Sequence, residues 1–311
     1  MSKSPKVSIV ILTTNALKMT QAQLANIAEL EVKDYNPECL VVDNGSSDGT
    51  EDSLGNYKLP NMDYKFIETG ANLGFAGGNN IGIKDALERG SDYVILMNND
   101  LILPKDIVTK LVDFMEDDKE VGLASPKMYF AKGYEFHKDR YQKGESGKVF
   151  WYAGGQIDRE NGYSSHKGVD EVDTGQYDKV METDFANGAC VIVRREVFEK
   201  VGYLDASFFL YWEDADFSER VKKNGYRVIY YPGTHLWHKV SSSTGGSGSP
   251  TNDYFLTRNR LYFAKRHLSL RAKFAIWRDT LRLAFKGRLW QRKGAIDAIA
   301  GITGMGAWAK R

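Results

Sequence analysis

Four short apolar runs, separated by polar or helical stretches, constrain the fold of the first third of the chain most strongly. They are Val7–Leu12, Cys39–Val42, Tyr64–Ile67 and Tyr93–Met97. Runs of this length with many β-branched residues predict buried strands, and the helical spacing of Met19–Leu30 predicts a helix between the first two. Alternating strands and helices predict an α/β fold whose central sheet is mostly parallel and is flanked by helices.

Polar residues directly follow the first, second and fourth of these strands, as TTN, DNGSSDGT and NND respectively. Ligands of parallel sheets bind beyond the carboxyl ends of the strands, so these segments should line one crevice. Asp43 could accept a hydrogen bond from a nucleobase imide or a ribose hydroxyl, and Asp100 is a suitable oxygen ligand for Mg²⁺ or Mn²⁺. Asn98 and Asn99 could hydrogen-bond a ribose or a phosphate. Ordinary Asx turns at strand ends explain the same residues equally well.

The glycine-rich segment at residues 72–80, NLGFAGGNN, invites comparison with nucleotide-binding motifs. It lacks the GxGxxG spacing of dinucleotide-binding folds and the lysine of a P-loop. Dehydrogenase and P-loop activities are therefore disfavoured. The glycines are better explained by close packing or by close approach of the backbone to a nucleotide.

An acidic group lies at the predicted start of a helix that runs to about Asn224. It comprises Glu213, Asp214 and Asp216. Acidic residues in a first turn stabilise a helix through its macrodipole, and this alone accounts for them. In the functional interpretation one carboxylate reaches the crevice as a general base, which contributes on the order of 10²–10⁴-fold to the rate. Tyr211 and Trp212 would then offer stacking surfaces to an acceptor sugar.

Histidines and arginines further along the chain are candidate ligands for a metal or a diphosphate. His238 is a better candidate than His235, although single histidines are more often structural. Arg258, Asn259 and Arg260 form a donor cluster that could clamp a diphosphate, or could cap and pair on a helix surface.

Two segments of the chain show weak periodicity. Residues 129–180 are polar, aromatic and glycine-bearing, which predicts an elaboration that shapes an acceptor pocket, with Trp151 and Gly155 as candidate lining residues. Ser241–Pro250, with the sequence SSSTGGSGSP, predicts either a linker or a mobile lid.

Charge is distributed unevenly along the 311 residues, whose formal net charge is only +1. Residues 255–311 contain fourteen Lys and Arg against two acids, whereas the rest of the chain has twenty-eight bases and thirty-nine acids. Apolar residues recur every three or four positions from Leu270 to Leu289, as in an amphipathic helix. A packed helix with a solvated basic face and a peripheral helix on an anionic membrane surface fit this pattern about equally. Nucleic-acid binding fits less well, because no recognised motif accompanies the charge.

The expected location is cytoplasmic. No apolar run is long enough to span a bilayer, and the first residues lack the apolar segment and cleavage site of a signal peptide. The basic end would allow peripheral attachment at the inner face of the cell membrane. Cys39 and Cys190 lie in apolar runs and are expected to be buried free thiols.

Taken together, the spaced motifs resemble glycosyltransferase family 2, and especially its rhamnosyltransferase-like branch. The matching segments, from Val7 to about Phe263, are VSIVILTTN, VVDNGSSDGT, NLGFAGGNNIGI, ILMNNDLIL, TDFANGACVIVRREVFEKVGYLD, FFLYWEDADFSERVKKNGYRV, HLWHKVSSSTG and YFLTRNRLYF. The resemblance implies a Rossmann-like GT-A fold for residues 1–263, with a nucleotide-binding part about 1–103 and an acceptor and catalytic part about 104–263. Residues 264–311 would form a basic amphipathic helical region.

The same resemblance implies roles for individual residues. Those expected to hold the nucleotide sugar are Thr13, Asn15, Asp43, Ser46, Asn80, Asn98 and Asn99. Those expected at the Mg²⁺ or Mn²⁺ cofactor and the leaving diphosphate are Asp100, His238, Arg258 and Asn259. Asp214 would be the catalytic base, with Glu213 beside it. Because the metal segment reads Asn98-Asn99-Asp100 where the family has two aspartates, strict metal dependence stays open.

The function expected from the resemblance is inverting transfer of a sugar from a nucleotide-diphosphate donor to a hydroxyl of a glycan or polyprenyl-linked glycan. The rhamnosyltransferase-like branch implies L-rhamnose from dTDP-rhamnose, with a UDP-sugar as the alternative donor. A catalytically inactive nucleotide-sugar-binding module is the alternative outside the enzymes. A nucleotidyltransferase would require a lysine near the phosphates, and none of the strand-end loops carries one.

Overall fold

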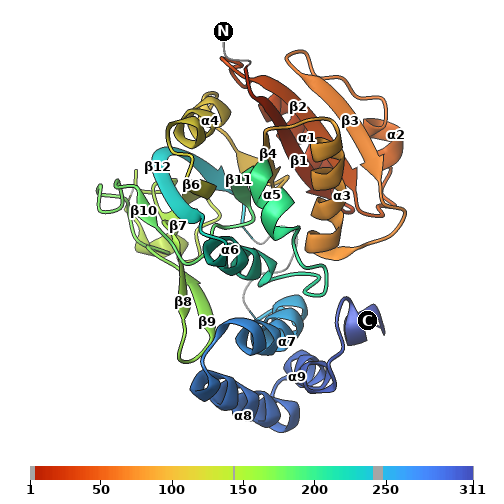
Figure 1. Ribbon diagram of the computed structural model, residues 1–311, viewed down its shortest axis with the longest axis vertical. Coiled ribbons are helices and arrows are strands. Elements are labelled where there is room, and N and C mark those ends of the chain that lie inside the picture. Colours follow the sequence, from red (N-terminus) through yellow and green to blue (C-terminus); the bar gives the residue numbers. More distant parts are fainter. Residues whose placement is uncertain (1–3, 143, 241–247, 311) are drawn as a thin grey trace.

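The computed structural model describes residues 4–142, 144–240 and 248–310, in which a large mixed sheet is flanked by helices (Figure 1). The strands are β1 (Lys6–Thr13), β2 (Asn36–Asp43), β3 (Asp63–Glu68), β4 (Tyr93–Met97), β5 (Leu101–Ile102), β6 (Val121–Phe130), β7 (Phe150–Tyr152), β8 (Gly155–Asp158), β9 (Tyr163–His166), β10 (Met181–Glu182), β11 (Cys190–Arg194) and β12 (Arg227–His238). The helices are α1 (Leu17–Ile27), α2 (Thr50–Leu54), α3 (Gly74–Glu88), α4 (Ile107–Asp117), α5 (Arg195–Val201), α6 (Glu213–Lys223), α7 (Pro250–His267), α8 (Leu270–Lys286) and α9 (Leu289–Ala300), with 3₁₀ helices η1 (Lys138–Arg140) and η2 (Gly306–Lys310).

The main sheet has ten strands within the described residues. Its order is β10-β12-β6-β11-β4-β1-β2-β3, with β5 added to β12 and β7 added to β6. The block from β3 to β4 is parallel throughout, and β6 is parallel to β12, whereas β11 runs antiparallel to both of its neighbours. Strands β8 and β9 form a separate hairpin.

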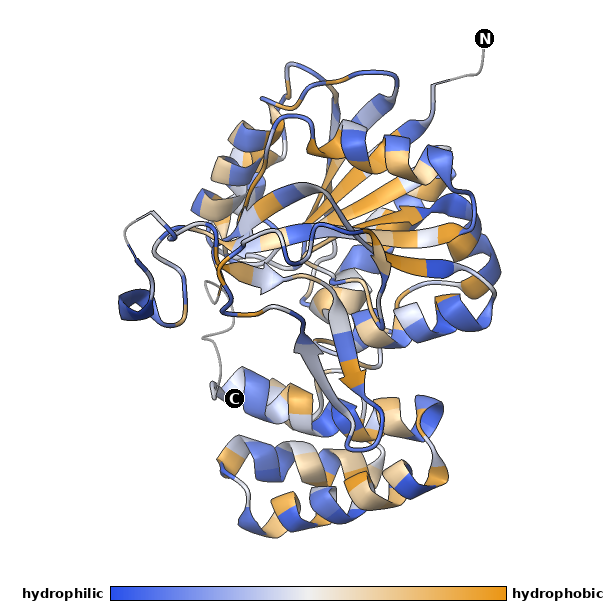
Figure 2. Cartoon of the chain, turned by 90° about the vertical axis from the view of Figure 1, so that its left-hand side faces the viewer, coloured by the Kyte–Doolittle hydropathy of each residue, from blue (hydrophilic) through white to orange (hydrophobic). Residues whose placement is uncertain are grey.

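Alternate residues of the strands face two separate cores, as the period of two in a strand requires. On β1, Val7, Ile9 and Ile11 pack into the core covered by α1 and α4, and Val10 packs into the core covered by α3, α5 and α6. All four side chains are fully buried. Figure 2 shows these hydrophobic strands in orange between the helices. The expected α/β fold with a mostly parallel central sheet is confirmed.

Strand β6, in the middle of the sheet, was not expected, because Pro126 and Lys127 interrupt its apolar run and proline cannot donate to a sheet ladder. The neighbouring strand adapts by a change of register. Tyr231 of β12 pairs with Pro126 and His235 pairs with Lys127, so the residues between them bulge out of the ladder. Strand β12 continues beyond this bulge and brings His238 alongside β5.

The C-terminal helices α7, α8 and α9 are drawn in blue and lie together below the part of the molecule that contains the sheet (Figure 1). Helix α7 starts at Pro250, after a Ser249 hydroxyl that accepts from the Asn252 N–H at 3.3 Å, and it runs through the domain boundary expected after residue 263. Helices α8 and α9 pack against α7 and against each other. In α8, Ala272 and Ile276 face the protein, whereas the predicted apolar stripe does not pack on it.

Three further expectations concern single segments. Both cysteines are buried and free, as expected. The linker or lid expected at Ser241–Pro250 falls mostly on residues 241–247, which lie outside the described residues. Within the parts of the chain that the structure describes, no helix has both the length and the apolar character needed to cross a membrane.

Candidate active site

The carboxyl ends of β1, β2 and β4 meet at one edge of the sheet and carry the first group of predicted residues. Thr13 and Asp43 are register partners at the ends of β1 and β2. A buried hydrogen-bond chain joins β4 to the same edge: the Asn99 amide donates to the Thr20 hydroxyl at 3.0 Å, which lies 2.8 Å from the Thr13 hydroxyl. The strand-end segments that were expected to gather therefore do so.

Two loops at this edge are tied together through Asn15. Its backbone N–H donates to the Ser46 hydroxyl at 2.9 Å, and its side-chain oxygen accepts from the Ser47 N–H at 2.7 Å. The Ser46 N–H donates to Asp43 Oδ1 at 3.1 Å. Asn15 has a φ of 48°, a left-handed conformation that asparagine tolerates better than most residues. This arrangement holds Asp43 in a defined orientation at the carboxyl edge of the sheet.

Asp100, which lies between β4 and β5, and His238, at the end of β12, are in contact. His238 Nε2 is 3.1 Å from Asp100 Oδ1, and both side chains are buried. The Trp151 ring packs edge-on against the His238 ring, with centroids 4.2 Å apart. His238 Nδ1 has no hydrogen-bond partner in the part of the chain that the structure describes, although it is buried. A buried polar atom of this kind favours a ligand at the site.

The residues at this position fit a divalent cation only if the substrate completes its coordination. No group of three or more His, Cys, Asp or Glu side chains in the described ranges could hold a metal ion. Mg²⁺ and Mn²⁺ are commonly bound by one or two protein ligands together with substrate phosphates and water. The Asp100 carboxylate and the His238 imidazole, in mutual contact, supply a donor set of that size.

Glu213 and Asp214 begin α6 and face the loop before β11. Burial raises the pKa of the Glu213 carboxyl well above its usual value, and the charge of Asp214 raises it further. Burial also raises the pKa of Asp214, which accepts weakly from the Gly188 N–H at 3.4 Å. The next residue, Ala189, accepts from the Asn98 N–H at 2.8 Å, so Asp214 is linked to the end of β4.

The loop that leads into α6 has an unusual backbone. Phe209, Tyr211 and Trp212 have φ values of 65°, 65° and 75°, a left-handed region that costs non-glycine residues energy and that clusters at functional sites. The Asn259 amide holds this loop by donating to the carbonyl oxygens of Phe208 at 2.9 Å, Leu210 at 2.7 Å and Tyr211 at 2.9 Å.

Arg258 supports the same loop. Its guanidinium donates to the Phe208 carbonyl at 2.7 Å and to the Gly304 carbonyl, and its side chain is fully buried. Arg258 and Asn259 were expected to meet the leaving diphosphate. In this structure most of their donors bind backbone carbonyls, and Arg258 Nε donates to the Asn259 side chain at 2.9 Å, so both residues support the loop that leads into α6.

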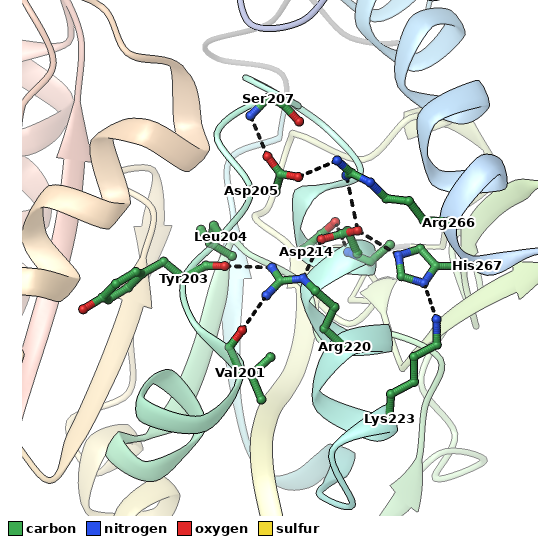
Figure 3. Close-up of polar contacts among 12 residues, drawn as sticks. Val201, Tyr203, Leu204, Asp205, Ser207, Asp214, Arg220, Lys223, Arg266 and His267 are labelled. Carbon is green, nitrogen blue, oxygen red and sulfur yellow. Dashed lines mark hydrogen bonds and ion pairs between the residues drawn. The ribbon is translucent and has the colours of Figure 1, made fainter.

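Asp216, a third carboxylate of α6, faces α7 and is surrounded by basic side chains, of which Figure 3 labels Arg220, Arg266 and His267. Asp216 lies 2.7 Å from His267 Nε2, 2.8 Å from Arg220 Nε and 3.6 Å from an Arg266 nitrogen. Burial acts to raise the pKa of Asp216, but the hydrogen bond from His267 and the charge of Arg220 outweigh it and leave the pKa below its usual value. We call this group the α6–α7 seam.

Several predicted residues occupy structural positions. The Asn80 amide donates to and accepts from the Leu204 backbone, at 2.8 and 3.1 Å, and so does not face a nucleoside here. Trp212 is buried with its ring 4.7 Å from that of Phe263, which leaves it no exposed face for a sugar. Gly155 is a packing position, since a Cβ there would lie 2.5 Å from the Phe185 ring.

The remaining candidates also lie in packed surroundings. The Tyr211 hydroxyl donates to the Asn252 side chain at 2.6 Å, which ties the loop to α7. His235 packs against the rings of Tyr129 and Trp237 and is therefore structural. Trp151, a candidate acceptor residue, is only partly buried, and its ring contacts the ring of His238 in the candidate active site.

The glycines of the NLGFAGGNN segment serve close packing. A Cβ on Gly78 would lie 2.4 Å from Leu12, and one on Gly74 would lie 2.5 Å from Phe209. Helix α3 can therefore approach both β1 and the loop that leads into α6. Of the two explanations proposed for these glycines, close packing is confirmed.

Two supporting groups escaped the sequence analysis. Thr20 and Gln23, buried on α1, hydrogen-bond the end of β4 and the Leu101 N–H. The sequence could have revealed them, because both are polar residues on the apolar side of a predicted helix.

The second group is His166 with its partners. Burial lowers the pKa of His166 to about 4, so it is neutral. It can then donate to the Trp151 carbonyl and accept from Asn187, both at 3.0 Å, which fixes Trp151 beside His238.

Known proteins share both the motifs and the fold. The family described as glycosyl transferase family 2 matches residues 8–202, and glycosyl transferase family group 2 matches residues 172–296. The dTDP-rhamnosyl transferase RfbF of Shigella flexneri is 27% identical over 306 residues, 92% of this chain and 95% of that protein. The N-acetylglucosaminyl-diphospho-decaprenol L-rhamnosyltransferase of Mycobacterium tuberculosis is 25% identical over 258 residues, 80% of each chain.

Two further proteins match this chain. The low-salt glycan biosynthesis hexosyltransferase Agl10 of Haloferax volcanii is 26% identical over 192 residues, 61% of this chain, and the match spans only 55% of that protein. The structure of the mannosyltransferase PcManGT from Pyrobaculum calidifontis, in complex with GDP-Man and Mn²⁺, superposes with a TM-score of 0.58 at 17% identity, covering 100% of this chain and 77% of that one. The chain belongs to glycosyl transferase family 2 and is a glycosyltransferase with the GT-A fold.

Proposed function

We propose that this enzyme transfers L-rhamnose, with inversion at the anomeric carbon, from dTDP-rhamnose to a hydroxyl of a lipid-linked glycan. The donor is supported by the Shigella relative, which is named as a dTDP-rhamnosyl transferase. The acceptor class is supported by the mycobacterial relative, whose name specifies an N-acetylglucosaminyl-diphospho-decaprenol. Each of the two spans at least 80% of this chain.

The observation that carries the catalytic part of the proposal is the environment of Asp214. Within the described residues no Lys, Arg or His forms an ion pair with it, and burial raises the pKa of its carboxyl. A carboxylate with a raised pKa is a stronger base. Asp216, two residues away, is paired with the guanidinium groups of Arg220 and Arg266 and is thereby unsuited to this role.

The proposed reaction is a single displacement. Asp214 takes the proton from the acceptor hydroxyl, whose oxygen attacks the anomeric carbon from the face opposite the diphosphate. A new carbon–oxygen bond forms as the bond to the diphosphate oxygen breaks, and dTDP leaves with the electron pair. Attack from the opposite face inverts the configuration, so no covalent sugar–enzyme intermediate is required.

Other residues of the crevice would bind and orient the donor. Thr13, Asn15, Asp43 and Ser46 form the edge proposed to hold the nucleoside, and Asn98 and Asn99 lie between it and the cation position. A Mg²⁺ or Mn²⁺ ion held by Asp100 and His238, with the donor phosphates completing its coordination, would neutralise charge on the leaving diphosphate. The burial of these two side chains would exclude water from that position.

A panel of donors tests the proposal. The purified protein is incubated with dTDP-rhamnose, UDP-glucose, UDP-N-acetylglucosamine and GDP-mannose, each with Mn²⁺, and release of nucleoside diphosphate is measured. We expect dTDP-rhamnose to be consumed fastest. Faster consumption of a UDP-sugar would reassign the donor, and no consumption of any donor, with or without a lipid-linked acceptor, would contradict the proposal.

A further inference from the structure

Helix α8 carries an apolar face that the rest of the protein leaves uncovered. It consists of Leu270, Phe274, Trp277 and Phe285, which are 83%, 65%, 43% and 78% exposed. We call these four residues the α8 apolar face. Their spacing places them on one side of the helix, whereas the side chains that pack on the protein, Ala272, Ile276 and Thr280, lie on another. Large apolar side chains gathered on a surface in this way indicate an interaction site.

Basic residues border this face. Helix α8 contains Arg271, Lys273, Arg278, Arg282 and Lys286 and a single acid. That acid, Asp279, is 2.6 Å from Arg260 of α7 and so is already paired within the protein. Arg271 pairs with Glu160 and Arg282 lies 3.7 Å from Asp279, but the basic residues of α8 still outnumber its single acid by five to one. Apolar side chains bordered by an excess of cations match the interfacial region of an anionic bilayer, where acyl chains lie beneath phosphate groups. The core of a protein–protein interface, by contrast, is usually depleted in charge.

The position of α8 connects this face to the candidate active site. Helix α8 lies at the opposite end of the molecule from the N-terminus (Figure 1). The turn of the β8–β9 hairpin reaches it, since Arg271 pairs with Glu160 at 2.6 Å and Gly162 packs on the Ile276 side chain. The other end of the hairpin carries His166, which fixes Trp151 beside His238. One short hairpin therefore spans from the α8 region to the candidate acceptor pocket.

We propose that the α8 apolar face inserts into the interface of an anionic lipid bilayer and that this contact presents the active site to a lipid-linked acceptor. The proposal rests on the proposed function for its acceptor but not for the binding itself. Phe274 and Trp277 enter the boundary between headgroups and acyl chains, and Arg278 and Arg282 contact lipid phosphates. Binding therefore depends on both apolar area and anionic lipid.

Vesicle flotation tests the proposal. The purified full chain is mixed with vesicles of phosphatidylcholine alone or with phosphatidylglycerol added, and the floating fraction is measured at low and high salt. We expect flotation with the anionic vesicles, weaker at high salt because screening shortens the reach of the basic residues. Phe274→Ser/Trp277→Ser should lower the partition coefficient about tenfold or more, since two large side chains lose their apolar burial.

Matched variants separate this surface from general effects. Val32→Ser/Val180→Ser removes exposed apolar side chains elsewhere, 38% and 48% exposed, and should float like the wild type. Arg278→Glu/Arg282→Glu should abolish anionic flotation, whereas Lys58→Glu/Lys119→Glu, with the same charge change on another surface, should reduce it far less. Hydrolysis of the donor in solution should be equal in all four variants.

The outcomes distinguish this proposal from the proposed function. Donor hydrolysis without flotation on anionic vesicles overturns the membrane proposal and leaves the function standing. Flotation that depends on Trp277, with no consumption of any nucleotide sugar, keeps the membrane surface and removes the proposed function. A stable dimer that Phe274→Ser/Trp277→Ser disrupts, with no flotation, assigns the face to a second copy of the chain and overturns the proposal.

Discussion

The two sides of α6 treat their carboxylates in opposite ways. On the side that faces the loop before β11, Glu213 is buried and Asp214 is partly buried. Neither has an ion-pair partner in the described residues, and the pKa values of both are raised. At the α6–α7 seam, Asp216 is paired with cations from two helices, and its pKa is lowered. The difference teaches that this fold balances the charge of Asp216, the carboxylate that joins α6 to α7, with basic side chains. It leaves the carboxylate next to the crevice able to accept a proton.

The largest expected effect is on catalysis. Asp214→Asn removes the proposed base but keeps the size and most hydrogen bonds of the side chain. We expect kcat for transfer to fall on the order of 10²–10⁴-fold while the affinity for dTDP, measured by calorimetry, stays near that of the wild type. Asp216→Asn is the matched comparison and should retain more activity. Equal transfer by Asp214→Asn and the wild type would remove Asp214 as the base.

The same two variants should rank in the opposite order for stability: Asp216→Asn should lose more stability than Asp214→Asn. Asp216→Asn leaves His267, Arg220 and Arg266 without their shared partner, so we expect the free energy of unfolding to fall by about 2–4 kcal/mol. Asp214→Asn removes a buried charge that has no cation beside it and should be neutral or stabilising. Urea denaturation measures both. A larger loss for Asp214→Asn would contradict the contrast between the two sides of α6.

A smaller effect is expected at the loop that leads into α6. Asn259→Ala removes the donor to three carbonyl groups of residues 208–211, which should lower the free energy of unfolding by about 1–3 kcal/mol and should also lower kcat. The exposed Asn56→Ala is the control and should change neither. If Asn259 instead contacted the leaving diphosphate, its loss would weaken binding of dTDP without destabilising the protein.

The mildest test is the pH dependence of transfer. A base must be deprotonated, so kcat/KM should rise with pH through the raised pKa of the Glu213–Asp214 pair. Glu213→Gln removes the second titrating member of the pair and should change the shape of this acidic limb, leaving the single step of Asp214. Glu219→Gln, on the same helix but paired with Arg159 and Lys222, should leave the limb in place. A change of equal size in both variants would argue against a coupled pair.

Much of the fold was predictable because its parallel strands are continuous apolar runs that stop at polar residues. Asp43 and Asp100 were found in this way, since the position of a strand end follows from the chain itself. Strand β6 was not found, because Pro126 and Lys127 break the pattern and only the bulge in β12 accommodates them. Local sequence carries no record of such an adjustment between strands.

The parts of the site that depend on distant contacts were less predictable. Asp214 and Asp216 look alike in the sequence, and their environments differ because Asp216 meets Arg220 of its own helix and also Arg266 and His267 of α7, about fifty positions away. Arg258 and Asn259 were recognised as a donor cluster. Their partners are carbonyls of the loop that leads into α6, and no local sequence pattern predicts the left-handed conformation of that loop. The apolar spacing of α8 was visible, whereas its exposure depends on which other face of the helix packs.

A crystal structure with Mn²⁺ and a non-hydrolysable analogue of dTDP-rhamnose would test the central claim most directly. The claim is that Asp43, Asp100 and Asp214 serve a single bound sugar nucleotide. We predict the nucleoside beside Asp43, the cation on Asp100 and His238, and the anomeric carbon facing the side of α6 that carries Asp214. A donor bound away from these carboxylates, or a sugar turned toward Asp216 and the α6–α7 seam, would contradict it.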